Sequence, residues 1–502
     1  MQLNRTIIPG PPGTGKTERL LYYLDKEILQ NKVDPKKIAY ISFSNAAADE
    51  ARSRAFNQDV NICTMHSMGT KELNINTNTQ LLKNKKWIGF QNYSRICKGM
   101  SFESYIDEAG IPRYKNPHMR IIEFARSKLV SLLEAAIQLN LHHSVDLWLT
   151  EQIDADLKVY KEHESLYEFS DMISKFVEKD RCPPVEIIFL DEAQDLSPLQ
   201  WRMFFYIESK CKRSYIAGDD DQTIYTFQGA DPTIFINLKG TIDAQIKSRR
   251  VPRKMHALAE SIFPHIKNRL EKKWEPRDAE GEVYDNMLIE DIDFSKENWM
   301  ILTRTNEMLQ PVADHLYSLN LRFDSKVNNL LPKKLLSAYR TLTRLNEGAS
   351  VSKEDVQDLY EHLNYHKGHV KYGYSGGKSL ESITTIDVDM LRKEHGFLLT
   401  GGWEQLHMPD ESKNYVKSLL DSKDDLMKNA RIKISTIHGV KGEECDNVVL
   451  FMDLERIIYE AAQINADPEH RLFFVGVTRA KKKLYIMQPT SDYFYRIGDP
   501  IV

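Results

Sequence analysis

The sequence has no long apolar run and few cysteines. No apolar segment in the 502 residues approaches the roughly 20 residues that a membrane-spanning helix needs, and residues 1–9 lack the pattern of a secretory signal. The five cysteines are scattered without a Cys-x-x-Cys pair, so neither a disulfide framework nor a zinc site is indicated. These absences argue against membrane-embedded and disulfide-stapled secreted proteins, and we expect a cytoplasmic protein with reduced thiols.

The sequence also lacks an excess of positive charge. Lys and Arg number 68 and Asp and Glu 72, which gives a formal net charge of −4. A simple nucleic-acid binder is often strongly basic, so composition alone does not predict one. A large protein can nevertheless bind a strand in a locally basic groove while its outer faces are acidic. Net charge therefore leaves the class of partner open.

Short apolar runs alternate with helical patterns along most of the chain. They predict parallel strands at 5–9, 38–43, 185–190 and 213–218, and again at 299–302, 432–435, 447–451 and 483–487. Length predicts about three or four domains. We expect two α/β cores, each with helices on both faces of a parallel sheet and each interrupted by a largely helical insertion. The predicted first core is 1–70 with 181–245, its insertion 71–180, the second core 246–325 with 429–502, and its insertion 326–428.

A glycine-rich loop lies between the first predicted strand and the first helix. Gly10-x-x-x-x-Gly15-Lys16-Thr17 is the P-loop pattern, in which backbone N–H groups surround phosphates, Lys16 meets the β/γ-phosphates and Thr17 binds Mg²⁺. A chance turn is a poor alternative in this strand-loop-helix context. The residues expected to hold ATP and Mg²⁺ here are Gly10, Pro11, Pro12, Gly13, Thr14, Gly15, Lys16 and Thr17.

An acidic pair follows the apolar strand at 185–190. Asp191 is expected to hold Mg²⁺ and Glu192 to activate the attacking water, because phosphoryl transfer needs metal charge and an oriented nucleophile. Without the P-loop, such a pair could also cap a helix, which is the less favoured interpretation. Together the two motifs predict an NTPase, but kinases, transporters and GTPases share them.

Further motifs extend the pattern over nearly the whole chain. They are Phe43-Ser-Asn45, Cys63-Thr64-Met-His66-Ser, Tyr167-Glu-Phe-Ser-Asp171, Gly218-Asp-Asp-Asp-Gln222-Thr-Ile-Tyr-Thr-Phe227, Arg250-Val-Pro, Thr436-Ile-His438-Gly-Val-Lys-Gly442-Glu-Glu444 and Val477-Thr-Arg479-Ala. In this order they resemble superfamily 1 DNA helicases of the UvrD/Rep/PcrA type, including compact and virus-encoded members. The resemblance implies two RecA-like cores with ATP and Mg²⁺ bound between them.

The resemblance also implies roles at the nucleotide site. Gln222 would sense the γ-phosphate, while Arg250 and Arg479 would reach from the second core to stabilise charge on the transferred phosphoryl group. Gly442 and Glu444 would approach the nucleotide from the same side. Lys16, Asp191 and Glu192 complete the expected catalytic set.

The implied partners are single-stranded DNA and its junctions with duplex. Aromatic side chains suit this track because every base offers a π-face for stacking. Taken singly, Phe43 or Phe227 is more typical of a core aromatic, and His66 of a surface or capping histidine. We expect a monomeric or weakly self-associating protein that works with replication or repair proteins. The expected DNA-binding residues are Phe43, Ser44, Asn45, Thr64, His66, Phe227, Thr436 and His438.

Several positions depart from the family pattern. Only nine residues precede Gly10, so we expect the usual adenine-reading segment to be missing, and Arg249 stands where a base-stacking tyrosine is common. Gln228 replaces an arginine. The second insertion is short, without a clear Gly-Ile-Gly element that contacts duplex; its basic-aromatic stretch 365–378, like Lys83–Lys98 in the first insertion, fits either a DNA contact or a solvated surface.

Three functions are compatible with these motifs. The first is an ATP-driven translocase that moves 3′→5′ and separates duplex, a direction implied by the Gly218–Tyr225 segment. The second is a nucleotide-switched factor that loads or displaces partners on DNA without processive unwinding. A small-molecule kinase is the third, but it leaves Arg250, Glu444 and Arg479 unexplained.

Overall fold

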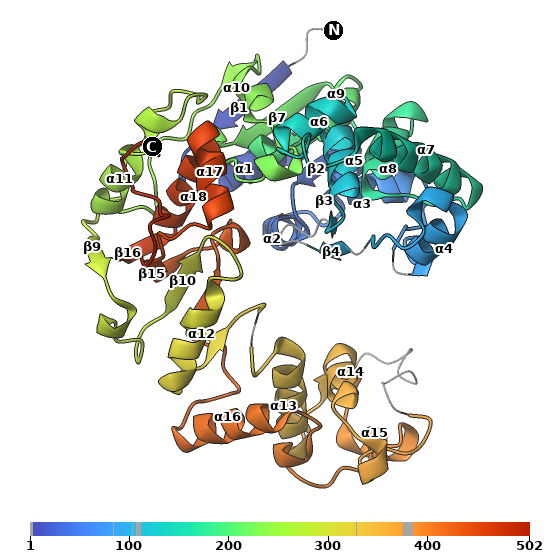
Figure 1. Ribbon diagram of the computed structural model, residues 1–502, viewed down its shortest axis with the longest axis vertical. Helices are drawn as coiled ribbons and strands as arrows, with labels where there is room; N and C mark the ends of the chain where they lie inside the picture. The colour runs from blue at the N-terminus through green and yellow to red at the C-terminus, as the bar shows by residue number, and fades with distance from the viewer. Residues whose placement is uncertain are drawn as a thin grey trace.

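The computed structural model describes residues 4–83, 85–102, 104–106, 112–327, 329–374 and 385–501. Of the two basic stretches noted above, Asn84 and residues 375–378 lie outside the described residues. The chain forms two sheet-centred cores side by side, with further helical bodies attached to each (Figure 1). No helix among the described residues is long and apolar enough to cross a membrane.

The first sheet has six strands, all parallel, in the order β3-β2-β6-β7-β1-β8. Four of them confirm predicted strands. The other two, β3 and β8, were not predicted, because β3 is only four residues long and β8 is an exposed two-residue edge. The strands are β1 (Asn4–Pro9), β2 (Ile38–Ser42), β3 (Asn61–Thr64), β6 (Ile187–Leu190), β7 (Arg213–Gly218) and β8 (Thr241–Ile242).

Helices cover both faces of this sheet. On one face, Leu20 and Leu24 of α1 (Lys16–Leu29) and Ala51 of α2 (Asn45–Arg54) pack against Ile8 and Tyr40. A second apolar cluster occupies the other face. Burial on both sides explains why the strands read as continuous apolar runs. The helices of the second cluster are α3 (Met65–Glu72), α8 (Phe169–Glu178), α9 (Pro198–Glu208) and α10 (Pro232–Ile236).

The second sheet repeats this architecture with the order β11-β14-β10-β15-β16-β9, again all parallel. α12 (Leu309–Ser318) packs on one face, while α11 (Arg253–Glu260) and α18 (Asp467–Val477) pack on the other; α17 (Arg456–Ile464) precedes α18. The predicted class, two α/β cores with parallel sheets, is confirmed. The strands are β9 (Glu282–Met287), β10 (Trp299–Thr303), β11 (Phe323–Asp324), β14 (Ile432–Thr436), β15 (Cys445–Leu450) and β16 (Ala480–Met487).

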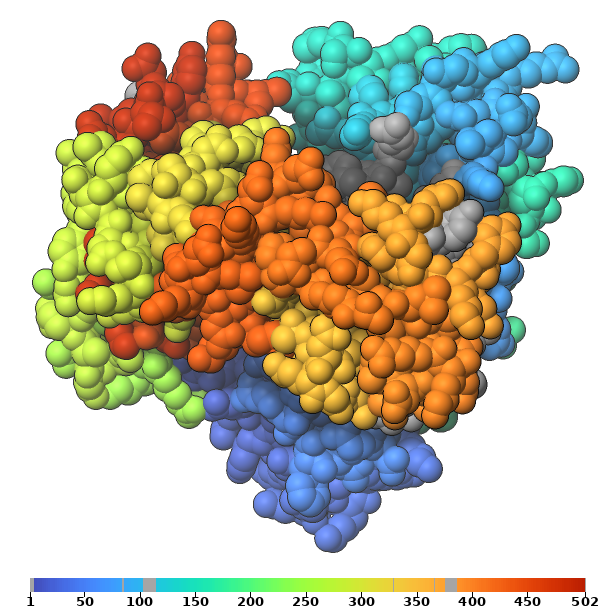
Figure 2. All heavy atoms as spheres, turned by 90° about the horizontal axis from the view of Figure 1, so that it is seen from below, coloured from blue at the N-terminus to red at the C-terminus, as the bar shows by residue number. Residues whose placement is uncertain are grey.

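A helical body interrupts each core. The first contains α4 (Lys85–Tyr93), α5 (Pro117–Lys128), α6 (Leu132–Gln138), α7 (Leu147–His163) and the hairpin β4 (Ser104–Ile106) with β5 (Pro112–Tyr114). The second contains α13 (Lys333–Asn346), α14 (Lys353–Glu361), α15 (Val388–Glu394), α16 (Asp410–Asp421) and the pair β12 (Val351–Ser352) with β13 (Thr385–Ile386). This orange body fills the foot of Figure 1 and faces the viewer in Figure 2.

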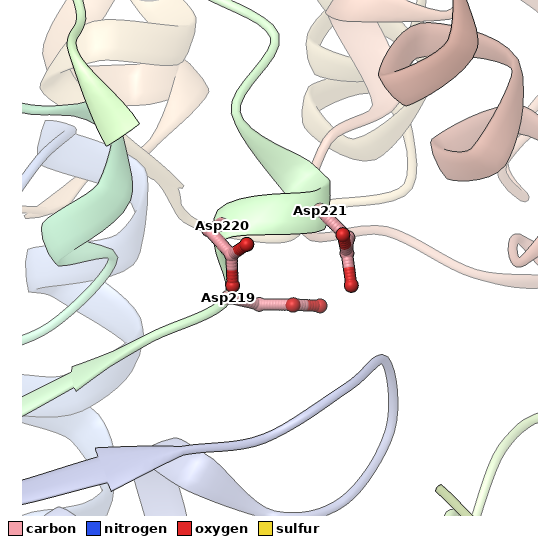
Figure 3. Close-up of side chains that lie close together, drawn as sticks. All are labelled: Asp219, Asp220 and Asp221. Atoms are coloured by element: carbon pink, nitrogen blue, oxygen red, sulfur yellow. The ribbon is translucent and has the colours of Figure 1, made fainter. Parts of the chain in front are cut away.

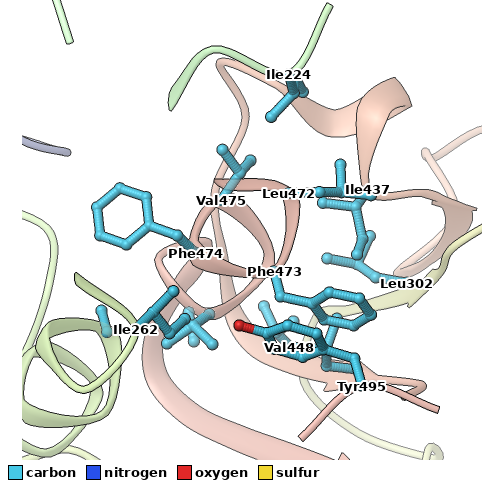
Figure 4. Packing of buried hydrophobic residues seen from close by; sticks show 14 of the residues in the cluster. Ile224, Ile262, Leu302, Ile437, Val448, Leu472, Phe473, Phe474, Val475 and Tyr495 are labelled. Carbon is cyan, nitrogen blue, oxygen red and sulfur yellow. The ribbon is translucent and has the colours of Figure 1, made fainter. Parts of the chain in front are cut away.

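The two cores share apolar packing. Ile224, Tyr225 and Ala230, which follow β7 of the first core, belong to the same buried cluster as Phe474 and Val475 of α18. Figure 4 shows Ile224 approaching Val475 from a separate segment of chain. The loop after β7 therefore ties the first core into the second.

Candidate nucleotide site and nucleic-acid interface

The P-loop spans the gap between β1 and α1 in a conformation that requires glycine. Gly13 and Gly15 have φ of 73° and 87°, which lie in the left-handed region. Gly15 begins α1 without a side-chain cap, so the first N–H groups of the helix are not satisfied by a side chain. Lys16 Nζ donates to Gly10 O at 2.8 Å within the loop. Burial lowers the pKa of Lys16, against the opposing effect of Asp219, Glu192 and Asp191.

The acidic pair lies beside this loop at the carboxyl end of β6. Asp191 Oδ2 accepts hydrogen bonds from Thr17 Oγ1 at 2.8 Å and from Tyr40 OH at 3.0 Å. Burial, and then the charge of Glu192, raise the pKa of Asp191 to about 6. Burial also opposes ionisation of Glu192, but Lys441 and Lys16 outweigh it and hold the pKa of Glu192 below its ordinary value.

A chain of hydrogen bonds leads from Glu192 to the second core. Gln194 Nε2 donates to Glu192 Oε2 at 2.5 Å, and Gln194 Oε1 accepts from Asp219 N at 2.9 Å. Gln222 Nε2 donates to Asp219 Oδ2 at 2.7 Å. Arg479 then donates to Gln222 Oε1 at 3.2 Å. Arg479 is fully buried, and burial followed by repulsion from Arg250 lowers its pKa to about 9.

The segment that carries Arg250 is hydrogen-bonded to the P-loop through the two residues that precede it. The neighbouring Arg249 N donates to Gly13 O at 2.8 Å, and Ser248 Oγ donates to Pro12 O at 2.8 Å. The guanidinium of Arg250 pairs with Glu444 of the second core. Arg250 thus lies between the P-loop and Glu444. Gly442, two residues before Glu444, has a left-handed backbone, and no atom of a described residue lies within 4 Å of where its Cβ would be, so the space beside it is open.

Four of the predicted DNA-binding residues line one hollow. A cavity of about 570 Å³ is bordered by Phe43, Asn45, Thr64 and His66, with Phe169 and Lys71 alongside. The ring of His66 meets Phe169 edge-on at 5.4 Å, and burial lowers the pKa of His66 to about 4. His66 therefore presents a neutral ring at neutral pH.

Three of the predicted polar residues also have structural tasks. Ser44 Oγ accepts from Ala47 N at 3.2 Å and Thr64 Oγ1 from Ser67 N at 3.2 Å, so they cap α2 and α3. Thr436 Oγ1 accepts from Gly439 N at 3.2 Å in the turn after β14. These side chains shape the loops that carry the neighbouring candidates.

Aromatic rings continue from this hollow onto the second core. Phe43 stacks on Tyr225 with centroids 5.2 Å apart, and Tyr225 approaches Phe227 at 6.3 Å. Phe227 in turn meets His438 edge-on at 5.3 Å, and about half of its side chain is exposed. Phe43, Tyr225, Phe227 and His438 thus form one run of rings that extends from the first core to the second.

Comparisons with known proteins bear on this arrangement. The description "UvrD/REP helicase N-terminal domain" matches residues 2–243, and "UvrD-like helicase C-terminal domain" matches residues 412–490. Together they cover well over half of the chain. The chain belongs to the UvrD/Rep helicase family. Residues 244–411 lie between the two matched regions.

Relatives of this UvrD-type helicase are distant but extend along its length. DNA helicase II of Rickettsia typhi is 22% identical over 607 aligned positions, covering 97% of this chain and 90% of that protein. PcrA of Leuconostoc citreum is 20% identical over an alignment that covers 97% of this chain and 80% of that protein. A probable DNA helicase II homolog of Mycoplasma genitalium is 28% identical over 46% of this chain and 36% of that protein. The Rickettsia alignment exceeds the 502 residues of this chain, so that relative contains segments that this UvrD-type helicase lacks.

The residues of the nucleotide site fit magnesium and a nucleoside triphosphate. Thr17 and Asp191 place a hydroxyl and a carboxylate oxygen 2.8 Å apart, and Mg²⁺ prefers such hard oxygen ligands. Lys16, Arg250 and Arg479 supply positive charge around the same loop. The nucleotide would bring the phosphoryl group and the metal would offset its charge.

The UvrD-type helicase also contains inter-core contacts that the sequence alone did not single out. Lys441 forms an ion pair with Asp195 and donates to Gln222 O at 2.7 Å. Burial raises the pKa of Asp195 to about 7, although Lys441 opposes the shift. Arg471 of α18 donates to Asp220 O at 3.0 Å. Lys441 occurs within a recognised motif and Arg471 lies six residues before another, but neither motif reveals these partners.

Three consecutive aspartates, Asp219 to Asp221, place their carboxylates close together (Figure 3). Lys272 Nζ lies within ion-pair distance of all three, and Arg269 pairs with Asp221 at 2.9 Å. Their charges are therefore compensated within the protein, and the cluster acts as a link between the first core and residues 269–272.

Proposed function

We propose that this chain is an ATP-dependent DNA helicase that moves 3′→5′ on single-stranded DNA, and that it acts in the cytoplasm. The observation that carries the proposal is the short segment from Gln222 to Phe227. Gln222 belongs to the hydrogen-bond chain that runs from Glu192 to Arg479, and Tyr225 and Phe227 belong to the run of rings. One rigid loop would thus couple the nucleotide site to the strand.

The proposed chemistry assigns one task to each nearby group. Thr17 and Asp191 would hold Mg²⁺, and Glu192, kept ionised by Lys441 and Lys16, would take a proton from the attacking water. Lys16, Arg250 and Arg479 would stabilise the charge on the transferred phosphoryl group. Gln222 would report the state of the site to the second core, whose movement advances the strand.

The proposed strand path runs along the hollow and the rings. Phe43, His66, Phe227 and His438 offer apolar ring faces, and stacking contributes roughly 1–3 kcal/mol per base without requiring a particular base. Asn45 is exposed at the rim of the hollow, where it can reach the sugar-phosphate backbone.

We keep the proposed division into cores 1–70 with 181–245 and 246–325 with 429–502, with insertions at 71–180 and 326–428.

Unwinding of matched 3′-tailed and 5′-tailed duplexes tests the proposal. With ATP, the 3′-tailed duplex is expected to be separated, and single-stranded DNA to stimulate hydrolysis many-fold. Lys16→Ala should abolish both activities. Preference for the 5′ tail would reverse the assigned direction, and hydrolysis indifferent to DNA would contradict the coupling. Repeating the assay with GTP shows whether Arg249, in place of a stacking aromatic, permits other bases.

A second candidate is a nucleotide-switched factor that loads or displaces partners on DNA. The segments that this chain lacks relative to its Rickettsia relative favour it, because a shorter chain offers less surface for duplex. The same tailed duplexes discriminate between the two. Strand separation by the protein alone excludes the second candidate, whereas stimulated hydrolysis without separation supports it.

A further inference from the structure

A cavity of about 620 Å³ lies where the second helical body joins the second core, far along the chain from the P-loop. Its core side is formed by β11 and residues 427–430, and its other side by α13. Phe323, Leu331, Leu336 and Met427 give it an apolar wall. Its volume is within the range of small-molecule sites in proteins.

Four basic side chains, Arg322, Lys333, Arg340 and Arg344, also line this cavity, together with the carboxylates of Asp324 and Asp355 and several neutral polar side chains. Arg322 is buried and already satisfied, because its Nε donates to Asp424 Oδ1 at 3.0 Å and its other nitrogens donate to Lys428 O at 2.9 Å and Asp425 O at 3.1 Å. Arg344 donates to Ser350 O at 3.0 Å, and its nearest approach to the carboxylate of Asp355 is 4.0 Å, the limit of ion-pair distance. Lys333 Nζ lies 3.6 Å from Asp324.

Arg340 forms its side-chain hydrogen bonds with backbone carbonyl groups, whereas each of the other three basic side chains of the cavity lies within ion-pair distance of a carboxylate. Its Nε donates to Leu426 O at 2.7 Å and a second nitrogen donates to Lys428 O, both neutral acceptors. Within the described residues, no carboxylate forms an ion pair with it. Burial and then repulsion from Arg322 lower the pKa of Arg340, and the charge of Asp425 offsets this shift only in part, so the surroundings as a whole disfavour its positive charge. An anion in the cavity would remove that penalty.

We propose that this cavity binds a phosphate-bearing anion between Arg340 and Arg344. Guanidinium groups match phosphate oxygens with paired donors, and two of them face the same space from one helix, four residues apart. The apolar wall would accommodate an organic group attached to the phosphate. Nothing in the proposed helicase function requires this site, so each can fail without the other.

Binding would also act on the joint between the two bodies. Arg340 of α13 already bonds the carbonyl groups of Leu426 and Lys428, which lead back into the second core. An anion held by the arginines against residues 427–430 therefore fastens the second helical body to that core. The site is a candidate for controlling its position.

The test uses the full-length Lys16→Ala protein, in which phosphate binding at the P-loop is weakened, and pyrophosphate as the probe. Calorimetry is expected to detect binding, and amide hydrogen exchange is expected to slow at residues 425–430. Arg340→Gln combined with Arg344→Gln should weaken binding roughly tenfold or more, because charged hydrogen bonds are lost. Arg340→Lys should retain a larger part of the affinity.

Lys334→Gln is the matched control, since Lys334 lies on the same helix but pairs with Glu361 at 2.8 Å and does not line the cavity. It should leave pyrophosphate affinity unchanged. Displacement of pyrophosphate by ADP would identify a free nucleotide as the source of the phosphate, and displacement by a short oligothymidylate would identify DNA. No slowing of exchange at 425–430, or equal affinity in the double variant and the Lys334→Gln control, would overturn the proposal.

Discussion

Two neighbouring carboxyl groups at the nucleotide site have pKa values that are shifted in opposite directions. Asp191 is buried and the adjacent Glu192 is partly exposed, and the pKa of Asp191 is raised while that of Glu192 is lowered. The difference follows from their neighbours, because Lys441 and Lys16 act most strongly on Glu192. Environment, and not residue type, therefore makes Glu192 the better candidate for an ionised base.

The first prediction concerns that base. Glu192→Gln should lower the rate of ATP hydrolysis by roughly 10²–10⁴-fold while ATP affinity is retained, because the amide cannot accept the proton from water. Single-turnover hydrolysis and nucleotide binding measure the two quantities separately. Glu186→Gln removes a carboxylate at the opposite end of β6, paired with Lys37, and should leave the rate unchanged. Full activity of Glu192→Gln would refute the assignment.

The second prediction concerns Asp195, whose pKa of about 7 lies above its ordinary value of 3.8. Above pH 7 Asp195 is ionised in the folded protein, although its burial disfavours the charge. As the pH falls toward 3.8, the folded state takes up a proton before the unfolded state does, and this destabilising contribution disappears. The melting temperature of Asp195→Asn relative to wild type should therefore be more favourable at about pH 8 than at about pH 5.

Asp180→Asn is the control for this comparison. Asp180 is exposed, and its hydrogen bond with Lys210 lowers its pKa, so it is ionised in both states over that range. Its difference from wild type should stay flat between about pH 5 and about pH 8. A flat difference for Asp195→Asn as well would show that Asp195 is not the titrating group.

At the scale of elements, loops between a strand and a helix carry most of the site. The P-loop follows β1, the acidic pair follows β6, and the segment to Phe227 follows β7, so all three meet at the same edge of the first sheet. The segment 248–250 then closes over the P-loop through Ser248 and Arg249. The fit between these two segments leaves no room for a side chain at Gly13.

The third prediction follows from that fit. A Cβ at Gly13 would lie 2.5 Å from Arg250 Cβ and 2.8 Å from Ser248 Oγ, in addition to the strain of its φ of +73°. Gly13→Ala should lower both the ATP affinity, by tenfold or more, and the melting temperature. Gly99→Ala is the control, because Gly99 has a φ of +83° and no atom of a described residue lies within 4 Å of the added carbon. It should show only the backbone cost of roughly 1–2 kcal/mol.

At the scale of the whole molecule, the cores are joined by apolar packing and by charge. Tyr225 is buried among residues of the second core and stacks on Phe43 of the first. From the second core, Lys441 forms an ion pair with Asp195 of the first core. Arg471 donates to the backbone carbonyl of Asp220, and Arg479 donates to the side-chain carbonyl of Gln222. Movement between the cores must therefore rearrange contacts at both the nucleotide and the ring surfaces.

The fourth prediction tests this joint. Tyr225→Ala should lower the melting temperature, since removing a buried aromatic ring costs about 3–5 kcal/mol, and should uncouple DNA binding from ATP hydrolysis. Tyr225→Phe keeps the ring and should retain most of the DNA stimulation. The ratio of hydrolysis rates with and without single-stranded DNA is the measurement. Unchanged stimulation in Tyr225→Ala would remove Tyr225 from the coupling path.

The sequence by itself determined the local features of this protein. The eight strongest strands, the P-loop and the acidic pair were all predicted, because each depends on a short run of residues whose backbone and burial preferences agree. It missed the short strands β3, β8, β9 and β11, whose lengths or exposed faces give weak patterns. It also missed the short pairs β4–β5 in the first insertion and β12–β13 in the second, whose strands of two or three residues are too short for a sequence pattern.

Only the tertiary structure decided which distant groups meet. Arg479 and Gln222 lie 257 positions apart and Lys441 and Asp195 lie 246 apart, and no periodicity in the sequence relates them. Lys272 occurs in a polar stretch without a motif, yet packing places it against three aspartates. Among the described residues no carboxylate forms an ion pair with Arg340, and this too follows from the packing of α13 on the second core. Such pairings depend on how whole layers pack, a property of the complete fold that local preferences do not encode.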